Sequence, residues 1–272
     1  MRNWIRIKTE EQLRAALESS KEFQCLIVDC ACMAGNNAET GNAGKVDLRM
    51  LRQEIGKHRD GQDCRLYLQL PDVLRQKRKE LVQTLLRQAE GFDGLVIKNL
   101  DELGLVLEAG AGQRYEIIAD AFLYAFNNES IRFYREQVPN LRFLYCDELT
   151  DREAGRLDGK KEDFIYKIYG YQPVMITAQC FYKNYYGCDR GKRAQVTLHD
   201  EAGNLFYAVS ECGQCYSVIY NGVPTSMLDQ NTDDYENILY DFTIETAEQV
   251  RQILEENTCG AYTRGHHRAG VD

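Results

Sequence analysis

The chain has 272 residues, of which 44% are hydrophobic and 28% charged, and its formal net charge at pH 7 is -9. This composition predicts a globular protein with a sizeable core, and the acidic balance argues against a surface that is basic throughout, while leaving room for a local basic patch. The first residues, MRNWIRIKTEEQ, lack the apolar segment of a signal peptide, and no run of about 18 apolar residues occurs. We therefore expect no membrane association and a reducing, cytoplasmic location.

Short apolar runs alternate with amphipathic stretches through the first two thirds of the chain. They predict strands at residues 4–7, 25–30, 65–70, 94–99, 116–122, 142–149, 164–170 and 174–178, and helices at residues 10–17, 78–90, 101–110 and 127–137. Thr9 and Gln12 form a capping-box pattern at the first helix. This order predicts an α/β fold, a parallel β/α barrel of the TIM type, complete or lacking part of its circuit. The glycine-rich segment 31–45 should be a loop at a strand's carboxyl end, where such barrels place their sites.

The pattern changes after Ala178. Residues 194–200 and 204–210 alternate apolar with polar side chains around the turn EAG, which predicts an antiparallel hairpin. A strand within residues 232–243 and a helix capped by Thr246 follow. We therefore expect two domains, a barrel at residues 1–178 and a cysteine-bearing hairpin module with a C-terminal closing segment at residues 179–272.

Four of the ten cysteines stand close together in the second part, as C-x7-C at Cys180 and Cys188 and as C-x2-C at Cys212 and Cys215. Two residues between thiolates let a tight turn direct both sulfurs at one ion or cluster, so the four cysteines predict a metal site. Zinc and an iron–sulfur cluster both fit this set of ligands. The alternative, that the thiols are unrelated buried side chains, stays open.

Polar residues near the ends of predicted strands are the candidate catalytic groups, namely Asp120, Asn127, Asp147 and Glu148. Side chains at such positions can point into a barrel mouth, although they more often cap loops or helices. Adjacent strand residues face opposite ways, so Asp147 and Glu148 are not expected to act as a dyad. None of the four histidines stands in a recognised nucleophile signature, which argues against proteolysis.

Several segments resemble the peptidase U32 family, the collagenase-like proteins. The segments in the second half are GYQPVMITAQC, LHDEAGNLFYAV, CGQCYSVIYNGVP and YTRGHHRAGV, and FDGLVIKNLDELG, IIADAFLYAFNNESI and YCDELT extend the resemblance over most of the chain. It implies a TIM-type barrel and a 4Fe–4S cluster on Cys180, Cys188, Cys212 and Cys215. It also implies oxygen-independent hydroxylation of ribosomal RNA, transfer RNA or a quinone precursor, as in several family members, whereas others carry only a protease label.

The chain departs from this family in two respects. Many members have a longer N-terminal region with its own barrel, so the resemblance implies that a partner protein could supply a second barrel. The interval between the first two cysteines is longer here than in the family signature. Gly170 and Tyr171 stand where that signature has a glutamate.

Three classes of function follow from these patterns. The first is an iron–sulfur enzyme that modifies RNA, in which basic residues contact phosphates. The candidates for these contacts are Lys183, Arg190, Lys192, Arg193, Arg264, His266 and Arg268. The second is a collagenase-like peptidase. The third is a non-catalytic interaction module in which zinc joins the hairpin to the barrel.

Overall fold

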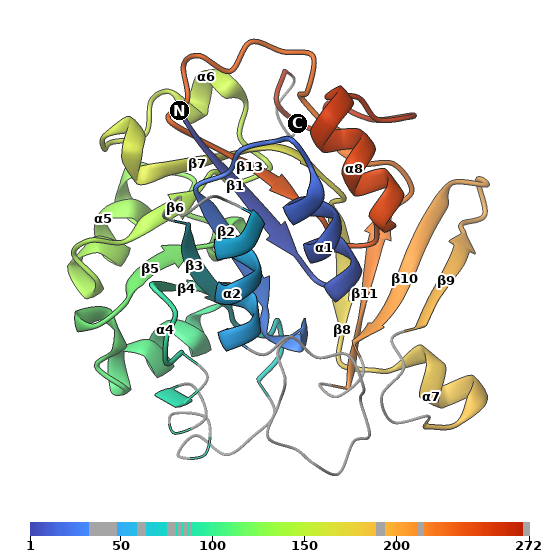
Figure 1. The fold of residues 1–272 in the computed structure, drawn as a ribbon, viewed down its shortest axis with the longest axis horizontal. Helices are drawn as coiled ribbons and strands as arrows, with labels where there is room; N and C mark the ends of the chain where they lie inside the picture. The colour runs from blue at the N-terminus through green and yellow to red at the C-terminus, as the bar shows by residue number, and fades with distance from the viewer. Residues whose placement is uncertain are drawn as a thin grey trace.

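The structure, a computed structural model, describes residues 1–32, 48–58, 64–74, 80, 83, 86–87, 89–188, 194–211 and 215–268. Eight parallel strands close into a barrel (Figure 1). In order around the barrel they are β1 (Arg2–Ile7), β2 (Cys25–Asp29), β3 (Arg65–Gln69), β4 (Gly94–Ile97), β5 (Glu116–Ala119), β6 (Arg142–Leu144), β7 (Phe164–Gly170) and β13 (Asn237–Asp241). Pairing of β6 with β7 and of β13 with β1 completes the circuit. The predicted parallel barrel is confirmed.

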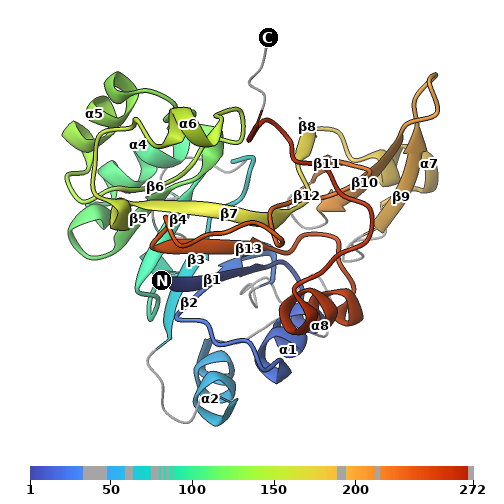
Figure 2. The same cartoon turned by 90° about the horizontal axis from the view of Figure 1, so that it is seen from above.

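Helices surround this barrel (Figure 2). They are α1 (Glu10–Glu18), α2 (Leu48–His58), α4 (Leu100–Glu108), α5 (Asn128–Gln137), α6 (Asp151–Ala154) and α8 (Ala247–Glu256), with short 3-10 turns η1 (Cys30–Cys32), η2 (Ala111–Gln113), η3 (Ala121–Leu123) and η4 (Lys161–Asp163). The capping box of Thr9 and Gln12 and the cap at Thr246 are present as predicted. Helix α2 was not predicted. The predicted helix at residues 78–90 and the loop at residues 31–45 lie largely outside the described residues.

A second, antiparallel sheet stands beside the barrel (Figures 1 and 2). Its strands, in the order β8-β11-β10-β9, are β8 (Pro173–Thr177), β9 (Ala194–His199), β10 (Leu205–Glu211) and β11 (Tyr216–Asn221). Helix α7 (Phe181–Tyr186) follows β8, and the short β12 (Thr225–Ser226) pairs with the edge of β7. The predicted hairpin is confirmed as β9 and β10.

The eighth barrel strand is not the one that was predicted. Residues 174–178 were expected to close the barrel, but β8 pairs antiparallel with β11 instead. Only Tyr171 and Gln172 separate β7 from β8, and parallel neighbours need a crossover of about a dozen residues or more. The eighth position is taken by β13, and α8 then packs against α1. The residues after 178 therefore contribute both to the antiparallel sheet and, through β13, to the barrel.

The barrel interior is divided into layers. Its middle is apolar and fully buried, built from one or two side chains of each strand: Trp4, Cys25, Ile27, Tyr67, Val96, Ile118, Leu144, Ile165 and Leu239. A larger apolar layer lies between the strands and the helices. The side chains of a strand point alternately into the barrel and toward the helices. This explains why most of the strands read as continuous apolar runs.

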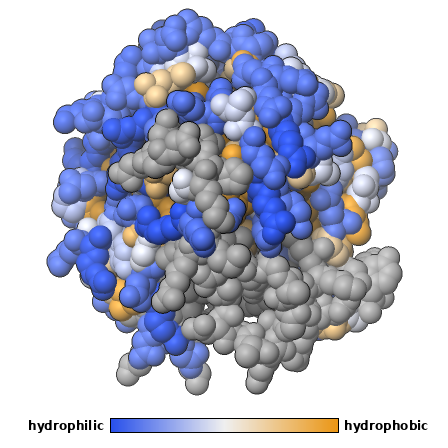
Figure 3. Space-filling model, viewed as in Figure 1, coloured by the Kyte–Doolittle hydropathy of each residue, from blue (hydrophilic) through white to orange (hydrophobic). Residues whose placement is uncertain are grey.

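The surface view agrees with the high charge of the sequence. On the face shown in Figure 3, the described atoms are mainly hydrophilic, with small hydrophobic patches between them. Within the described part of the chain, we find no helix with the length and apolar character that crossing a bilayer requires.

The close approach of neighbouring strands at Gly94 gives a test of the barrel packing. A Cβ atom at Gly94 would lie 2.5 Å from the Glu116 carbonyl oxygen and 2.6 Å from the Tyr67 ring. We expect Gly94→Ala to lower the free energy of unfolding by about 1–3 kcal/mol in chemical denaturation. Gly56→Ala is the control, because a Cβ atom there in α2 meets nothing within 4 Å. It should raise stability by up to about 1 kcal/mol. Equal effects of the two substitutions would contradict the packing described.

Candidate functional site

The interior of the barrel changes from apolar to charged at the carboxyl ends of its strands. In β1, Trp4 is followed on the same face by Arg6, and Ile118 of β5 is followed by Asp120, directly after the strand. The same two-residue step occurs in other strands. The buried polar residues that it places at the mouth are Arg6, Lys8, Asp29, Gln69, Lys98, Asp120, Lys167 and Asp241. Charges are costly to bury unless they are paired, so their partners define the site.

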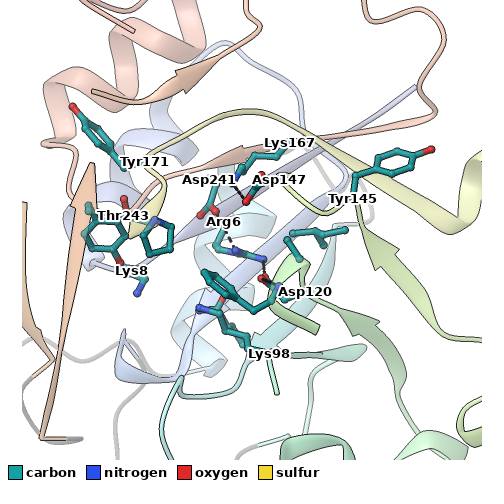
Figure 4. Close-up of a pocket in the computed structure, with 16 residues that line it drawn as sticks. Arg6, Lys8, Lys98, Asp120, Tyr145, Asp147, Lys167, Tyr171, Asp241 and Thr243 are labelled. Carbon is teal, nitrogen blue, oxygen red and sulfur yellow. Dashed lines mark hydrogen bonds and ion pairs between the residues drawn. The ribbon is translucent and has the colours of Figure 1, made fainter. Parts of the chain in front are cut away.

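Arg6 lies at the centre of the mouth, between two carboxylates (Figure 4). Its Nη2 is 2.6 Å from Asp120 Oδ2, and its Nη1 is 3.1 Å from Asp241 Oδ2. Burial alone would raise the pKa of Asp120, but the charges of Arg6 and Lys98 and the hydrogen bond from Arg6 hold it below its usual value. Asp120 is therefore a carboxylate at neutral pH, able to accept hydrogen bonds but not to donate one.

A second network joins the mouth to the antiparallel sheet. Lys98 pairs with Asp72, which also accepts a hydrogen bond of 3.0 Å from the Tyr216 hydroxyl of β11. Burial would raise the pKa of Asp72, but Lys98, Lys8 and the bond from Tyr216 lower it to about 2. Burial would lower the pKa of Lys98, but Asp72 and Asp120 raise it above its usual value. Lys98 is therefore a fixed cation rather than a neutral amine.

Lys8 makes the other contact between barrel and sheet. Its ammonium lies 3.6 Å from Asp29 and 3.5 Å from Glu211, the last residue of β10. It also lies over the ring of Tyr220 in β11, 5.9 Å from the centroid. Glu211 directly precedes Cys212 in the chain. The contact with Lys8 therefore places the end of the sheet that leads into the C-x2-C segment at the barrel mouth.

The mouth encloses a small cavity of about 30 Å³, room for one or two water molecules. Its charged lining includes Lys167, which pairs with Asp147 at 2.7 Å. Strands β8 and β11 contribute Pro173 and Tyr220, so the antiparallel sheet covers part of the opening. Among the residues that the structure describes, the lining of this cavity includes Phe122, Tyr145 and Tyr171 but no serine, cysteine or histidine. The lining therefore supplies fixed charges and aromatic surface rather than a nucleophile with a base.

Two of the four predicted catalytic candidates lie at the mouth. Asp120 and Asp147 line the same cavity. Asn127 instead caps α5, where its side chain accepts a hydrogen bond from the Ser130 amide, and Glu148 is exposed and accepts one from the Cys146 thiol.

Sequence reasoning missed most of the mouth. Arg6, Lys8, Lys98, Lys167 and Asp241 were not proposed as site residues. The signal that could have found most of them is the two-residue step from an inward apolar residue to a charged one at the ends of β1, β4, β7 and β13.

The structure describes three of the four candidate metal ligands. Cys180 is the N-cap of α7, and its sulfur accepts a hydrogen bond of 3.5 Å from the Lys183 amide. Cys188 follows α7. Cys215 lies between β10 and β11, in a backbone conformation with a φ angle of 59°. Cys212 lies outside the described residues. Thr177 pairs with Ser217, which places Cys180 and Cys215 at the same end of the sheet. No group of three or more histidine, cysteine or acidic side chains suited to a metal ion occurs within the described ranges. Convergence of all four thiols stays a prediction.

The predicted phosphate-contacting residues are only partly described. Arg190, Lys192 and Arg193 lie outside the described residues, and Lys183 and His266 are exposed. Arg264 makes two contacts of 2.6 Å with the Asp229 carboxylate, and Arg268 donates to Gln230. A common basic face formed by this set stays a prediction.

One buried acid stands behind the wall of the mouth. Glu245 follows β13, and its carboxylate accepts hydrogen bonds from the amides of Thr243 and Ile244 at 2.6 and 2.9 Å. Burial raises its pKa to about 7, although the amides of Thr243 and Glu245 and the Tyr169 hydroxyl act in the opposite direction. Glu245 fixes the turn that carries Thr243 into the lining of the cavity.

Comparisons with known proteins do not identify a family. No protein-family model matches the chain, and no curated protein matches it. A solved structure described as "Crystal structure of an uncharacterized B. cereus protein" matches 93% of this chain at 8% sequence identity, with a TM-score of 0.37. The matched region is 64% of that protein, so this chain spans less than two thirds of its length.

The central ion pairs predict a large cost for removing Arg6. Arg6→Met leaves Asp120 and Asp241 buried without their partner, so we expect the free energy of unfolding to fall by about 3–5 kcal/mol in denaturant titrations. The triple variant that also carries Asp120→Asn and Asp241→Asn should recover part of this loss. Arg14→Gln, which breaks the exposed pair with Glu10 in α1, should cost less than about 0.5 kcal/mol. A loss as small for Arg6→Met would contradict the arrangement.

Glu245 predicts a pH dependence of stability. Its folded-state pKa of about 7 exceeds the value of 4.5 expected in the unfolded chain, so its contribution is fully present below pH 4.5 and is lost as the pH rises through about 7. Glu245→Gln is neutral throughout. Between about pH 5 and pH 8, the wild type should lose up to roughly 3 kcal/mol of stability relative to this variant in urea unfolding. Glu129→Gln, on the exposed face of α5, is the control, and parallel pH profiles for all three proteins would refute the assignment.

Proposed function

We propose that this chain is a peptidase U32-like enzyme that depends on an iron–sulfur cluster and hydroxylates an RNA base at the barrel mouth. The observation that carries the proposal is the contact between the mouth and the cysteine-bearing end of the antiparallel sheet. Lys8 with Glu211 and Asp72 with Tyr216 hold that end against the carboxyl ends of the barrel strands. A cluster on Cys180, Cys188, Cys212 and Cys215 would then lie beside the substrate. It would pass single electrons from the base to a bound oxygen-atom donor, which is the two-electron oxidant that the hydroxylation requires.

The polar atoms of the mouth support a substrate with both donors and acceptors. Among the described residues, Arg6 Nε, Gln69 Oε1 and Asp241 Oδ1 are buried without hydrogen-bond partners. All three residues line the cavity. A group that presents a carbonyl beside an N–H, as the edge of a nucleobase does, could accept from Arg6 and donate to Gln69 or Asp241.

The walls of the mouth suit a planar ring. Phe122, Tyr145 and Tyr171 line the cavity and offer aromatic faces on which a base can stack. The cations Arg6, Lys98 and Lys167 are positioned to stabilise negative charge that develops on the ring during reaction. Because the cavity is small, side chains that cover it must move before a base can enter.

Proteolysis is the weaker alternative. A peptidase of the serine or cysteine type needs its nucleophile beside a base. The described lining of the mouth contains no serine, cysteine or histidine, and His267 is instead bound to Asp151 at 3.0 Å.

Anaerobic purification followed by iron, sulfide and zinc analysis tests the cofactor. We expect about four iron and four sulfide per chain, as a 4Fe–4S cluster requires. Cys212→Ser and Cys215→Ser should lose the iron, whereas Cys259→Ser should retain it. One zinc ion per chain would instead support the non-catalytic module, and no metal at all would remove the proposed centre.

Mass analysis of RNA nucleosides tests the reaction after anaerobic incubation with the holoenzyme and a small-molecule extract of cells, which supplies the oxygen-atom donor. The proposal expects a gain of one oxygen atom in a base. Lys167→Met should retain its iron and lower this rate by about a hundredfold, the effect of removing one charge-stabilising group. Unchanged nucleosides in the presence of an intact cluster would exclude RNA as the substrate.

A further inference from the structure

We propose that the barrel carries a second binding site, for a phosphate group, at the end opposite the mouth. A cavity of about 1080 Å³ lies there, bounded by the residues that begin β1, β5, β6 and β13. Sites for small ligands typically measure about 300–1,000 Å³, so this space can accept a nucleotide-sized group. The apolar middle layer of the barrel separates it from the mouth. The two sites therefore do not share residues.

The lining of this cavity is basic in a protein that is acidic as a whole. Six basic side chains line it: Arg2, Arg65, Arg114, Arg135, Arg142 and Lys160. Four acidic side chains accompany them: Glu116, Glu162, Asp163 and Glu236. The local excess is positive, whereas the chain as a whole carries -9. A concave surface with an excess of one charge concentrates ions of the opposite sign, which here favours an anion.

The acidic residues do not neutralise the arginines one for one. Glu116 is shared between Arg142, at 2.8 Å, and Arg65. Burial would raise the pKa of Glu116, but the hydrogen bond and charge of Arg142 and the charge of Arg65 lower it. It is therefore ionised and supplies one negative charge for two cations. The Arg65 side chain remains 43% exposed, so part of its guanidinium can still reach a ligand.

Two further arginines are available. Arg2 and Arg114 are exposed, and the described part of the chain offers neither of them an ion-pair partner. Arg114 rests on the ring of Tyr115, 5.5 Å from its centroid, which limits the directions in which its guanidinium can point. Guanidinium groups bind phosphate oxygens through two parallel hydrogen bonds. Arg2, Arg65 and Arg114 together form the phosphate-binding set.

Binding to the full chain tests this site without reference to the mouth or to any metal. Inorganic phosphate and a nucleoside monophosphate are titrated by calorimetry, and a short unstructured RNA is titrated by fluorescence anisotropy. The double variant Arg2→Gln/Arg114→Gln is compared with Arg14→Gln/Arg251→Gln, which removes two exposed arginines of α1 and α8 that do not line the cavity. Both pairs change the net charge equally, and thermal melting confirms that both variants fold.

We expect the cavity variant to bind its ligand at least about tenfold more weakly, and the control variant to bind as the wild type does. Tight binding of the mononucleotide or of phosphate identifies a small ligand. Binding of RNA alone, with a salt dependence whose slope falls by about 0.7 for each phosphate-binding arginine removed, identifies the RNA backbone. Equal weakening in both variants would show a long-range charge effect and overturn the site, as would a wild type that binds none of the three probes at millimolar concentration. Neither result would affect the proposal for the mouth.

Discussion

The burial of Arg6 is the constraint on which the rest of this structure depends. A guanidinium inside a barrel is tolerated only where carboxylates meet it. Asp241 comes from β13, the neighbour of β1, and Asp120 comes from the end of β5, across the barrel from β1. A slip of one residue in any of these strands would turn its charge outward and leave the others unpaired. The charged layer therefore helps to specify the strand register, which the apolar layer below it defines less sharply because many apolar side chains can replace one another.

The same layer links the two sheets. Lys8 follows β1 but reaches Glu211 of β10, and Asp72 follows β3 but accepts from Tyr216 of β11. Polar contacts of this kind are directional, so they hold the antiparallel sheet at one position over the barrel, whereas the apolar contacts of Val209 and Val218 permit sliding. The geometry of the mouth and the position of the cysteine-bearing end of the sheet therefore depend on the same ion pairs and hydrogen bonds.

Much of the fold could be predicted from local patterns, because seven barrel strands and the hairpin are short apolar or alternating runs bounded by turns. The eighth strand could not, since residues 174–178 and β13 look equally suitable and only the two-residue connection after β7 decides between them. The residues of the mouth could be predicted only in part. Asp120 and Asp147 are acidic residues that directly follow apolar runs in the sequence, whereas Arg6 lies within an apolar run. Its partners are 114 and 235 residues away, so closure of the barrel alone reveals the pairing.

The late position of β13 has a consequence for synthesis of the chain. Strand β1 begins at Arg2, yet one of its two neighbours begins only at Asn237. While the ribosome extends the chain, one edge of β1 has no native partner until β13 has emerged, and all strands of the antiparallel sheet are synthesised in the interval. An open strand edge can pair with other chains. Nascent molecules of this protein should therefore depend on chaperones that bind exposed strands for longer than barrels whose last strand follows directly on the seventh.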